Sequence, residues 1–286
     1  MKKRTGIFGA GQAGAAAASW LPDTQQLICF IDNNEQRQQQ KFQGIAVCSP
    51  AEAMEKRLDV IWTAVLNREA GEAIERQLKE LGFEGEIISV QRFRQQQDIR
   101  LALLRMAAAE IRDRNVPGAI AELGVYQGDF AAEMNRLFRE RTLYLFDTFC
   151  GFDSRDLEME NANGNRFVQE GKFSDTSVEL VEKKLPYPEQ AVFCRGHFPE
   201  STQLITEKLS GFALVSIDPD LYEPVYQGLK FFYPLLSPGG MLLIHDYNSM
   251  QYPGVKKAVR RYCTEQNLYV VPMTDLHGSA VLIRQG

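Results

Sequence analysis

The segment Ala121–Asp147 constrains the fold of this chain of 286 residues more than any other stretch. It begins with a short apolar run, turns at Gly124 and reaches a second glycine at Gly128. A stretch of helical length follows, and a second apolar run, LYLF, ends on Asp147. A strand, a glycine turn, a helix, a strand and an acid in this order predict the first half of a nucleotide-binding α/β unit.

The spacing of these residues indicates the kind of nucleotide. Glu122, Gly124 and Gly128 form the pattern E-x-G-x-x-x-G, which is more typical of S-adenosylmethionine (SAM) sites than of dinucleotide sites. The two glycines would let the backbone approach the amino-acid tail of SAM, which Glu122 would face. Asp147 would accept hydrogen bonds from both ribose hydroxyls, since an ionised acceptor makes strong ones. In the alternative, Glu122 only contacts a helix N-terminus and Asp147 is an exposed acid.

Composition narrows the class of protein. The net charge of −5 gives no reason to expect a nucleic acid or a membrane surface as partner. No apolar run approaches the roughly 20 residues of a spanning helix, and the basic start MKKR leads into a glycine motif rather than a signal peptide. The five scattered cysteines contain no CxxC pair, which disfavours a zinc knuckle or a disulfide framework. A cytoplasmic protein is therefore expected.

A second glycine motif stands near the start of the chain. Gly9, Gly11 and Gly14 follow the strand candidate Thr5–Phe8, and Asp32 ends the next apolar run. An acid about 20 residues after such glycines is the arrangement that places a carboxylate on a ribose in dinucleotide folds. These four residues are a candidate second nucleotide site. The alternative, that the glycines serve a tight turn and close helix–strand packing, is favoured because no dehydrogenase catalytic domain follows.

These patterns divide the chain into three parts. Residues 1–90 alternate strands and helices as a small Rossmann-like domain, and residues 91–116 are a polar linker followed by a connecting helix. Residues 117–286 form the second domain, a doubly wound α/β sheet with an antiparallel last pair of strands, as in class I methyltransferases. Its predicted strands are AIAELG, LYLFD, AVFCRG, FALVSID, GGMLLIHD, LYVVP and SAVLIR.

Four longer motifs carry a family resemblance: ELGVYQGDFA, FDTFCGFD, RGHFPES and IDPDLYEPVYQGLKFFYPLLSPGGMLLIHDY. With them, the segment Ala119–Arg261 resembles the macrocin O-methyltransferase family, which includes sugar O-methyltransferases of antibiotic pathways. The resemblance implies SAM as methyl donor, a divalent metal, and a hydroxyl of a sugar, polyol or related natural product as acceptor. We expect a small-molecule acceptor and no nucleic-acid or membrane partner, and a homo-oligomer is compatible with the sequence.

The resemblance extends the predicted cofactor site. Gly196 and His197 follow the third strand, where this fold meets the adenine ring, and Tyr126 and Thr148 lie in the first two motifs. Asp218 is included because it ends a strand next to the cofactor cleft. For His197, an ordinary loop position is the alternative.

Three residues form the predicted catalytic and metal-binding group. Asp218 ends the strand FALVSID, and His245 and Asp246 end GGMLLIHD. Parallel neighbouring strands bring their carboxyl ends together, so these side chains can converge on one ion, and carboxylate oxygens suit magnesium. Such a cation would bind two vicinal acceptor oxygens and favour the alkoxide, as it does, by resemblance, in the family and in catechol O-methyltransferases. Asp220 is an alternate ligand or acceptor contact, or part of a turn.

His245 departs from the family pattern, in which an aspartate usually stands at this position before Asp246. Imidazole is a poor ligand for magnesium and a good one for manganese, iron, nickel or zinc. Three interpretations stay open. His245 ligates a softer metal, acts as a general base, or marks a subfamily that has lost the metal.

The insert Gly151–Pro188 is too long for a simple connector, and we expect a lid that excludes water from the cleft. Aromatic candidates for the acceptor pocket are Phe152, Phe167, Phe173, Tyr222, Tyr247 and Tyr252. The sequence thus predicts a SAM-dependent O-methyltransferase. An NAD(P)-linked oxidoreductase or nucleotide sensor built on the first domain is the alternative, and a catalytically inactive SAM-binding scaffold is a third.

Overall fold

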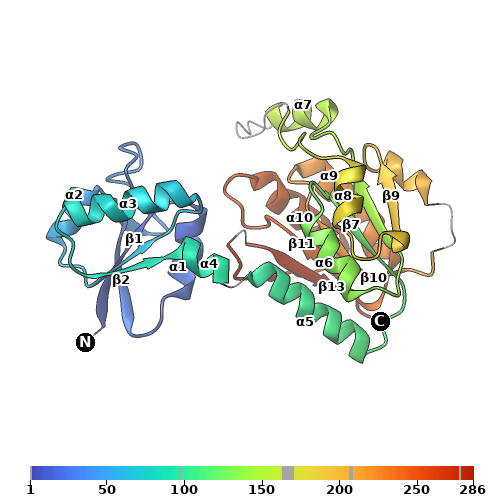
Figure 1. The fold of residues 1–286 in the computed structure, drawn as a ribbon, viewed down its shortest axis with the longest axis horizontal. Helices are drawn as coiled ribbons and strands as arrows, with labels where there is room; N and C mark the ends of the chain where they lie inside the picture. The colour runs from blue at the N-terminus through green and yellow to red at the C-terminus, as the bar shows by residue number, and fades with distance from the viewer. Residues whose placement is uncertain (1, 97, 163–170, 206–208, 277) are drawn as a thin grey trace. The chain divides into compact units, whose positions relative to one another are not determined.

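The computed structural model describes residues 2–96, 98–162, 171–205, 209–276 and 278–286 of the chain (Figure 1). The backbone forms two compact units. Unit 1 extends to Ile99 and includes Thr274–Leu276, and unit 2 comprises Arg100–Met273 and residues 278–286. Each unit contains one sheet. The predicted domain boundaries stay predictions. Among the described residues, no helix is long and apolar enough to cross a membrane.

Unit 1 is a mainly parallel sheet flanked by helices, in which the short edge strand at Lys41–Phe42 is antiparallel to its neighbour. Its elements are β1 (Lys3–Phe8), α1 (Gln12–Trp20), β2 (Gln25–Ile31), β3 (Lys41–Phe42), β4 (Ile45–Cys48), α2 (Pro50–Glu55), β5 (Val60–Thr63), α3 (Arg68–Glu80), β6 (Glu86–Ser89) and α4 (Val90–Gln96). The strand order is β3-β4-β2-β1-β5-β6, and β1 pairs in parallel with β2 and β5. Ser49 and Glu52 form a capping box that begins α2. This is the half-Rossmann arrangement that the first glycine motif predicts.

Unit 2 contains the larger sheet. Its strands are β7 (Ala119–Leu123), β8 (Leu143–Asp147), β9 (Ala191–Arg195), β10 (Phe212–Ile217), β11 (Leu236–Ile244), β12 (Val271–Pro272) and β13 (Ala280–Ile283). Its helices are α5 (Ile99–Asp113), α6 (Asp129–Leu137), α7 (Ser154–Ala162), α8 (Val178–Lys184), α9 (Tyr222–Leu235) and α10 (Pro253–Gln266). The order is β12-β13-β11-β10-β7-β8-β9, with β13 antiparallel to β11 and β12. The predicted seven-stranded class I methyltransferase sheet is confirmed.

The central strand β10 shows why this sheet brings polar side chains together. Its sequence FALVSI is buried at every position, as expected for a parallel strand that is covered on both faces. Helices α5 and α6 lie on one face of the sheet (Figure 1). Their apolar side chains pack in one core cluster, and those of α9 and α10 pack in the cluster on the other face. Because side chains alternate along a strand, the face of α5 and α6 also receives the polar residues at four strand ends: Glu122, Asp147, Asp218 and His245.

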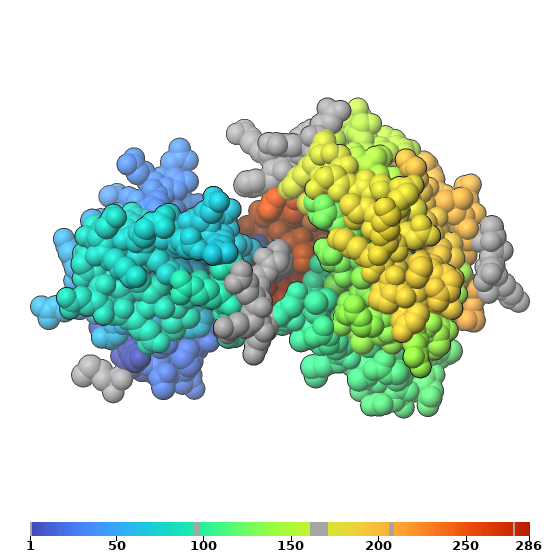
Figure 2. Space-filling view, in the orientation of Figure 1, coloured from blue at the N-terminus to red at the C-terminus, as the bar shows by residue number. Residues whose placement is uncertain are grey.

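The predicted lid segment contains α7 and α8, and both helices pack onto unit 2. Glu160 of α7 accepts a hydrogen bond of 2.7 Å from the backbone N–H of Tyr222, at the start of α9. Val181 of α8 packs against Gly128, and Figure 2 shows the yellow surface of α8 directly beside the green surface of α6. Phe167, a predicted acceptor contact, lies outside the described residues. Closure of this segment over a ligand stays a prediction.

The turn after β7 yields a test of this packing. Gly124 has a φ of +85°, and a Cβ there would lie 2.3 Å from the carbonyl oxygen of Asp218. Gly171 has a φ of +79°, and no atom of the described residues lies within 4 Å of a Cβ there. Gly171→Ala should therefore lower the free energy of unfolding by about 1 kcal/mol, the strain of a left-handed residue alone, whereas Gly124→Ala should lower it by about 3 kcal/mol. Chemical denaturation followed by circular dichroism measures both. Equal losses would contradict the close approach.

Candidate active site

Two acids and an imidazole meet at the carboxyl ends of β10 and β11. The Nδ1 atom of His245 lies 2.8 Å from Oδ1 of Asp218 and 2.9 Å from Oδ2 of Asp246. One potential ligand atom from each of the three residues falls within 4.8 Å of the other two. Asp246 adopts a φ of +54°, a left-handed conformation that aspartate tolerates better than most residues. The juxtaposition expected from neighbouring parallel strands is thus present in the fold.

The geometry of this cluster suits a divalent cation. Ligand atoms about 2.1 Å from an octahedral ion and at right angles to each other lie about 3 Å apart. The separations of 2.8 and 2.9 Å around His245 Nδ1 match that value. Two carboxylates with one imidazole form a donor set that manganese or iron accepts more readily than magnesium does. The residues present therefore fit a bound metal, with His245 favouring the softer ions.

Opposite charges balance one another within the cluster. A guanidinium nitrogen of Arg100 donates to Asp218 Oδ2 at 2.8 Å. Burial raises the pKa of Asp218, but the charges of His245 and Arg100 outweigh burial and hold that pKa at about 2. Burial lowers the pKa of His245, and the two aspartates that face its ring outweigh burial and raise the pKa to about 10. Without a metal, His245 is an imidazolium at neutral pH, which disfavours its role as a general base.

Asp220 lies beside this cluster and interacts with Asp246. Burial raises the pKa of Asp220 well above its usual range, and the negative charges of Asp218 and Asp246 raise it further. Burial and the same acids also raise the pKa of Tyr252, which is only 5% exposed. A buried carboxyl group with a raised pKa beside other acids is a common feature of proton-transfer sites. Asp220 is therefore a second candidate for the general base, beside His245.

Glu122 occupies the end of β7 as a buried acid. Its side chain is 1% exposed, and its Oε2 atom has no hydrogen-bond partner among the described residues. Burial raises the pKa of Glu122 well above its usual range, while the nearby guanidinium of Arg100 opposes this shift. A buried acceptor without a donor is costly. The α-ammonium group of SAM would supply the missing donor, so this residue fits the predicted cofactor.

Asp147 holds the glycine turn in place. Its Oδ2 atom accepts the backbone N–H groups of Val125 at 2.7 Å and Tyr126 at 3.0 Å, and its Oδ1 atom accepts that of Phe149 at 2.8 Å. Both oxygens are thus used by the backbone of this chain. The ribose contact predicted for Asp147 stays a prediction, since it would have to share these oxygens.

The other predicted residues of the cofactor loop also have internal partners. The hydroxyl of Tyr126 donates to Asp175 at 2.9 Å, and that of Thr148 donates to the carbonyl of Gly151. A Cβ at Gly128 would lie 2.7 Å from Val181, so close packing already requires a glycine there. These contacts place the loop firmly, and its binding to SAM stays a prediction.

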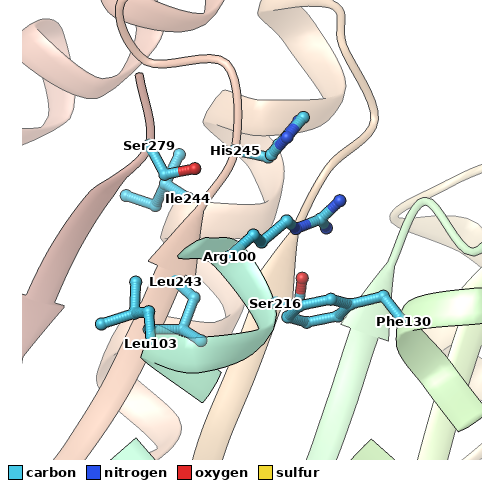
Figure 3. Close-up of a pocket in the computed structure, with 8 residues that line it drawn as sticks. All are labelled: Arg100, Leu103, Phe130, Ser216, Leu243, Ile244, His245 and Ser279. Atoms are coloured by element: carbon cyan, nitrogen blue, oxygen red, sulfur yellow. The ribbon is translucent and has the colours of Figure 1, made fainter. Parts of the chain in front are cut away.

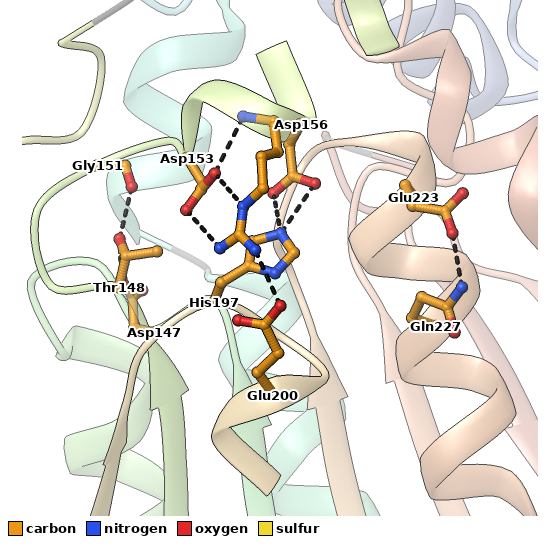
Figure 4. A network of polar contacts seen from close by, with 10 residues as sticks. Asp147, Thr148, Gly151, Asp153, Asp156, His197, Glu200, Glu223 and Gln227 are labelled. Atoms are coloured by element: carbon orange, nitrogen blue, oxygen red, sulfur yellow. Dashed lines mark hydrogen bonds and ion pairs between the residues drawn. The ribbon is translucent and has the colours of Figure 1, made fainter. Parts of the chain in front are cut away.

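His197 points towards α7 in a polar network (Figure 4). Its Nε2 atom lies 3.2 Å from both carboxylate oxygens of Asp156. Arg155 forms ion pairs with Asp153 and with Glu200. Gly196 precedes His197 with a φ of +142°. The network ties α7 to the segment after β9, which is a structural role for His197, and the adenine contact stays a prediction.

The glycines of unit 1 have a packing role. A Cβ at Gly14 would lie 1.9 Å from the carbonyl oxygen of Gly9, and a Cβ at Gly9 would lie 2.7 Å from that of Ala64. These approaches let α1 pack closely on β1.

Asp32 also has partners within unit 1. Its carboxylate accepts the N–H of Ala10 at 3.0 Å and pairs with Arg37 at 3.2 Å, beside Gly11. Close packing and these contacts account for the motif without a ligand, and the second nucleotide site stays a prediction.

Aromatic candidates for the acceptor pocket fall into two groups. Phe173 packs against Phe152 at 5.3 Å between ring centroids, and the Lys172 ammonium lies 5.0 Å from the Phe173 ring and 4.7 Å from that of Tyr252. These rings adjoin the acid cluster through Tyr252, whose pKa responds to the three aspartates.

The second group lies on α9 and beside α10. Tyr222 stacks on Tyr226 at 6.2 Å, and Tyr247 is covered by Lys256 at 5.2 Å. These contacts of Tyr222 and Tyr247 are packing contacts, and their partners, Tyr226 and Lys256, are not members of the acid cluster.

Sequence reasoning missed two cations of this site. Arg100 stands one helical turn before Leu104, and so on the apolar stripe of α5 that continues at Ala108 and Ile111. A charged residue in line with buried ones is a signal that the helical periodicity contains. Lys172 donates to the hydroxyl of Tyr252, but it comes from the long insert, where no periodicity indicates its direction.

The fold and the cluster define a class I methyltransferase architecture. A family model described as Macrocin-O-methyltransferase (TylF) matches residues 72–285. The chain therefore belongs to the macrocin O-methyltransferase family. A second model, described as C2185-like, N-terminal, matches residues 1–89.

Individual relatives agree with this family. Demethyldecarbamoylnovobiocin O-methyltransferase from Streptomyces niveus is 29% identical over 57% of this chain and 64% of its own length. Mycinamicin III 3''-O-methyltransferase from Micromonospora griseorubida is 30% identical over 53% of this chain and 62% of its own length. These matches span less than two thirds of either relative.

Two solved structures resemble the fold. The O-methyltransferase NovP has a TM-score of 0.53 and 25% identity, over 65% of this chain and 80% of that one. The calicheamicin methyltransferase CalS11 has a TM-score of 0.50 and 18% identity, over 82% of this chain and 91% of that one, which supports the fold alone.

The raised pKa of His245 leads to a test of metal binding. A metal must displace the proton on Nδ1, so a pKa of about 10 implies that affinity rises with pH throughout the neutral range. The dissociation constant for Mn²⁺ should fall by about 10-fold per pH unit while imidazolium dominates. Titration followed by electron paramagnetic resonance measures it. His245→Asp should flatten this slope and favour Mg²⁺. A pH-independent affinity of the unaltered protein would contradict a role for His245 as ligand.

Proposed function

We propose that this protein is a SAM-dependent O-methyltransferase that acts on a hydroxyl of a sugar or a sugar-bearing natural product. The observation that carries the proposal is the meeting of Asp218, His245 and Asp246 with the buried Glu122 on one face and one edge of the sheet. A site for an ammonium group beside a site for a cation is what methyl transfer to a vicinal diol requires. The acceptor class rests on the names of the relatives.

The residues of the chain would hold the two reactants in line. SAM supplies a methyl group that its sulfonium already activates, so alignment of the reacting atoms provides much of the rate. Glu122 would hold the α-ammonium group, and the turn from Gly124 to Gly128 would adjoin the rest of the amino-acid tail. Asp218, His245 and Asp246 would hold a divalent cation, manganese or magnesium, which when bound favours the alkoxide form of the acceptor hydroxyl.

Asp220 would take the proton of the acceptor hydroxyl. Its pKa is raised by burial and by Asp218 and Asp246, and a base works best when its pKa lies near the working pH. Tyr252 and Phe173, with Lys172 between their rings, would form the wall that keeps water away from the transferred methyl group. This arrangement assigns His245 to the metal and leaves proton transfer to Asp220.

Methyl transfer from isotopically labelled SAM to a panel of sugars, nucleotide sugars and glycosides tests the function. Asp218→Asn and Asp246→Asn should each reduce kcat by about 1,000-fold or more, as expected for loss of a ligand that orients the acceptor. The dissociation constant of S-adenosylhomocysteine should stay within about 3-fold, because the cofactor tail binds elsewhere. Asp129→Asn is a matched control, since that side chain is 82% exposed. Equal loss of cofactor affinity in both variants would show that these acids serve the cofactor instead.

Replacement of Asp220 tests the proton transfer. Asp220→Asn should lower kcat by about 100- to 10,000-fold, the usual range for a lost general base, and should abolish the fall in rate at acidic pH. The affinity for Mn²⁺ should stay close to that of the unaltered protein, because the three ligands are intact. An acidic limb that persists in the variant would show that another group takes the proton.

A further inference from the structure

Arg100 stands apart from the other arginines of its helix. It lies in the first turn of α5, in line with the buried residues of that helix, and its guanidinium lies 4.0 Å from the ring centroid of Phe130 in α6. Figure 3 shows it extending between Phe130 and His245, in a pocket that Ser216 also lines. Arg105, five residues later on the same helix, instead pairs with Glu133 and is 56% exposed. The side chain of Arg100 therefore extends from α5 towards the acid cluster.

A small pocket lies beside the guanidinium of Arg100. Phe130, Ser216 and His245 are among the residues that line it, so it adjoins the acid cluster through His245.

The charges at this end of the cleft match a zwitterion. Glu122, which is 1% exposed, has an oxygen without a donor among the described residues. Its neighbour across the sheet is Ser216 of β10, which lines the same pocket as Arg100. An amino acid presents an ammonium group and a carboxylate on one carbon, so it needs an acceptor and a donor side by side. Glu122 and Arg100 provide these two, and a planar guanidinium with five donors can bind one carboxylate while it keeps another, that of Asp218.

We propose that Arg100 binds the α-carboxylate of SAM while Glu122 binds its α-ammonium group. This inference rests on the proposed SAM-dependent function and assigns the residue that selects for an intact amino-acid tail. Arg100 would then contact both the cofactor carboxylate and Asp218. It links the cofactor to the acid that would hold the metal, so it positions the donor relative to the acceptor without taking part in bond making.

Binding of ligands with and without the carboxylate tests this assignment by calorimetry. The unaltered protein should bind S-adenosylhomocysteine about 10- to 100-fold more tightly than its decarboxylated analogue, as expected for a charge-assisted bidentate contact. In Arg100→Gln that ratio should shrink to about 3-fold or less, because only the lost contact distinguishes the two ligands. Arg105→Gln, the matched control, should keep the full ratio.

The outcomes separate this inference from the function on which it rests. Failure of the unaltered protein to bind S-adenosylhomocysteine would reject the proposed function. Tight binding with a full ratio in Arg100→Gln, or a ratio near one in the unaltered protein, would reject the role of Arg100 alone. If Arg100→Gln does not fold, Arg100→Lys, which keeps the charge without the fork, should show an intermediate ratio, and an unchanged ratio there would overturn the bidentate contact.

Discussion

The sharing of Asp218 between Arg100 and His245 is the interaction on which the rest of the site depends. One oxygen of the Asp218 carboxylate lies 2.8 Å from a guanidinium nitrogen of Arg100, and the other lies 2.8 Å from the imidazole Nδ1 of His245. Loss of either cation would leave this carboxylate, which is 18% exposed, with one charged partner instead of two and would weaken the cluster. The acids at this edge of the sheet can therefore be assembled before any metal binds. A metal would replace a proton on His245 and leave the contact with Arg100 in place.

The same edge shows how a parallel sheet concentrates function. Four strands end on polar residues that face α5 and α6, while the preceding residues on that face are apolar apart from Ser216. Asp147 uses its oxygens to fix the turn that contains Gly124, and Gly124 in turn packs on the backbone of Asp218. The turn and the cluster are thus mechanically joined. Small changes at either one would be transmitted to the other, because close-packed groups cannot shift independently.

Much of this site could be predicted from the sequence because it lies at strand ends. Apolar runs locate β7, β10 and β11, and the polar residue after each run must lie at the edge where the runs end. That rule places Glu122, Asp218 and His245. The rule does not predict the positions of Arg100 and Lys172. The direction of Arg100 depends on how α5 packs on the sheet, and that of Lys172 depends on the path of a long insert. The sequence patterns also assign ligand-binding roles to glycines that packing alone explains. Gly128 and the glycines of unit 1 are required because neighbouring atoms lie too close for a Cβ.

Thermal denaturation of the full chain with S-adenosylhomocysteine and, separately, with NAD⁺ tests the central claim most directly. If the edge of the larger sheet is a SAM site, the first ligand at 100 times its dissociation constant should stabilise the protein by about 2.7 kcal/mol, and the melting temperature should rise by several degrees. NAD⁺ should leave it unchanged, because Asp32 and the glycines of unit 1 are occupied by internal contacts. A rise with NAD⁺ and none with S-adenosylhomocysteine would contradict the assignment of the cofactor to the larger sheet.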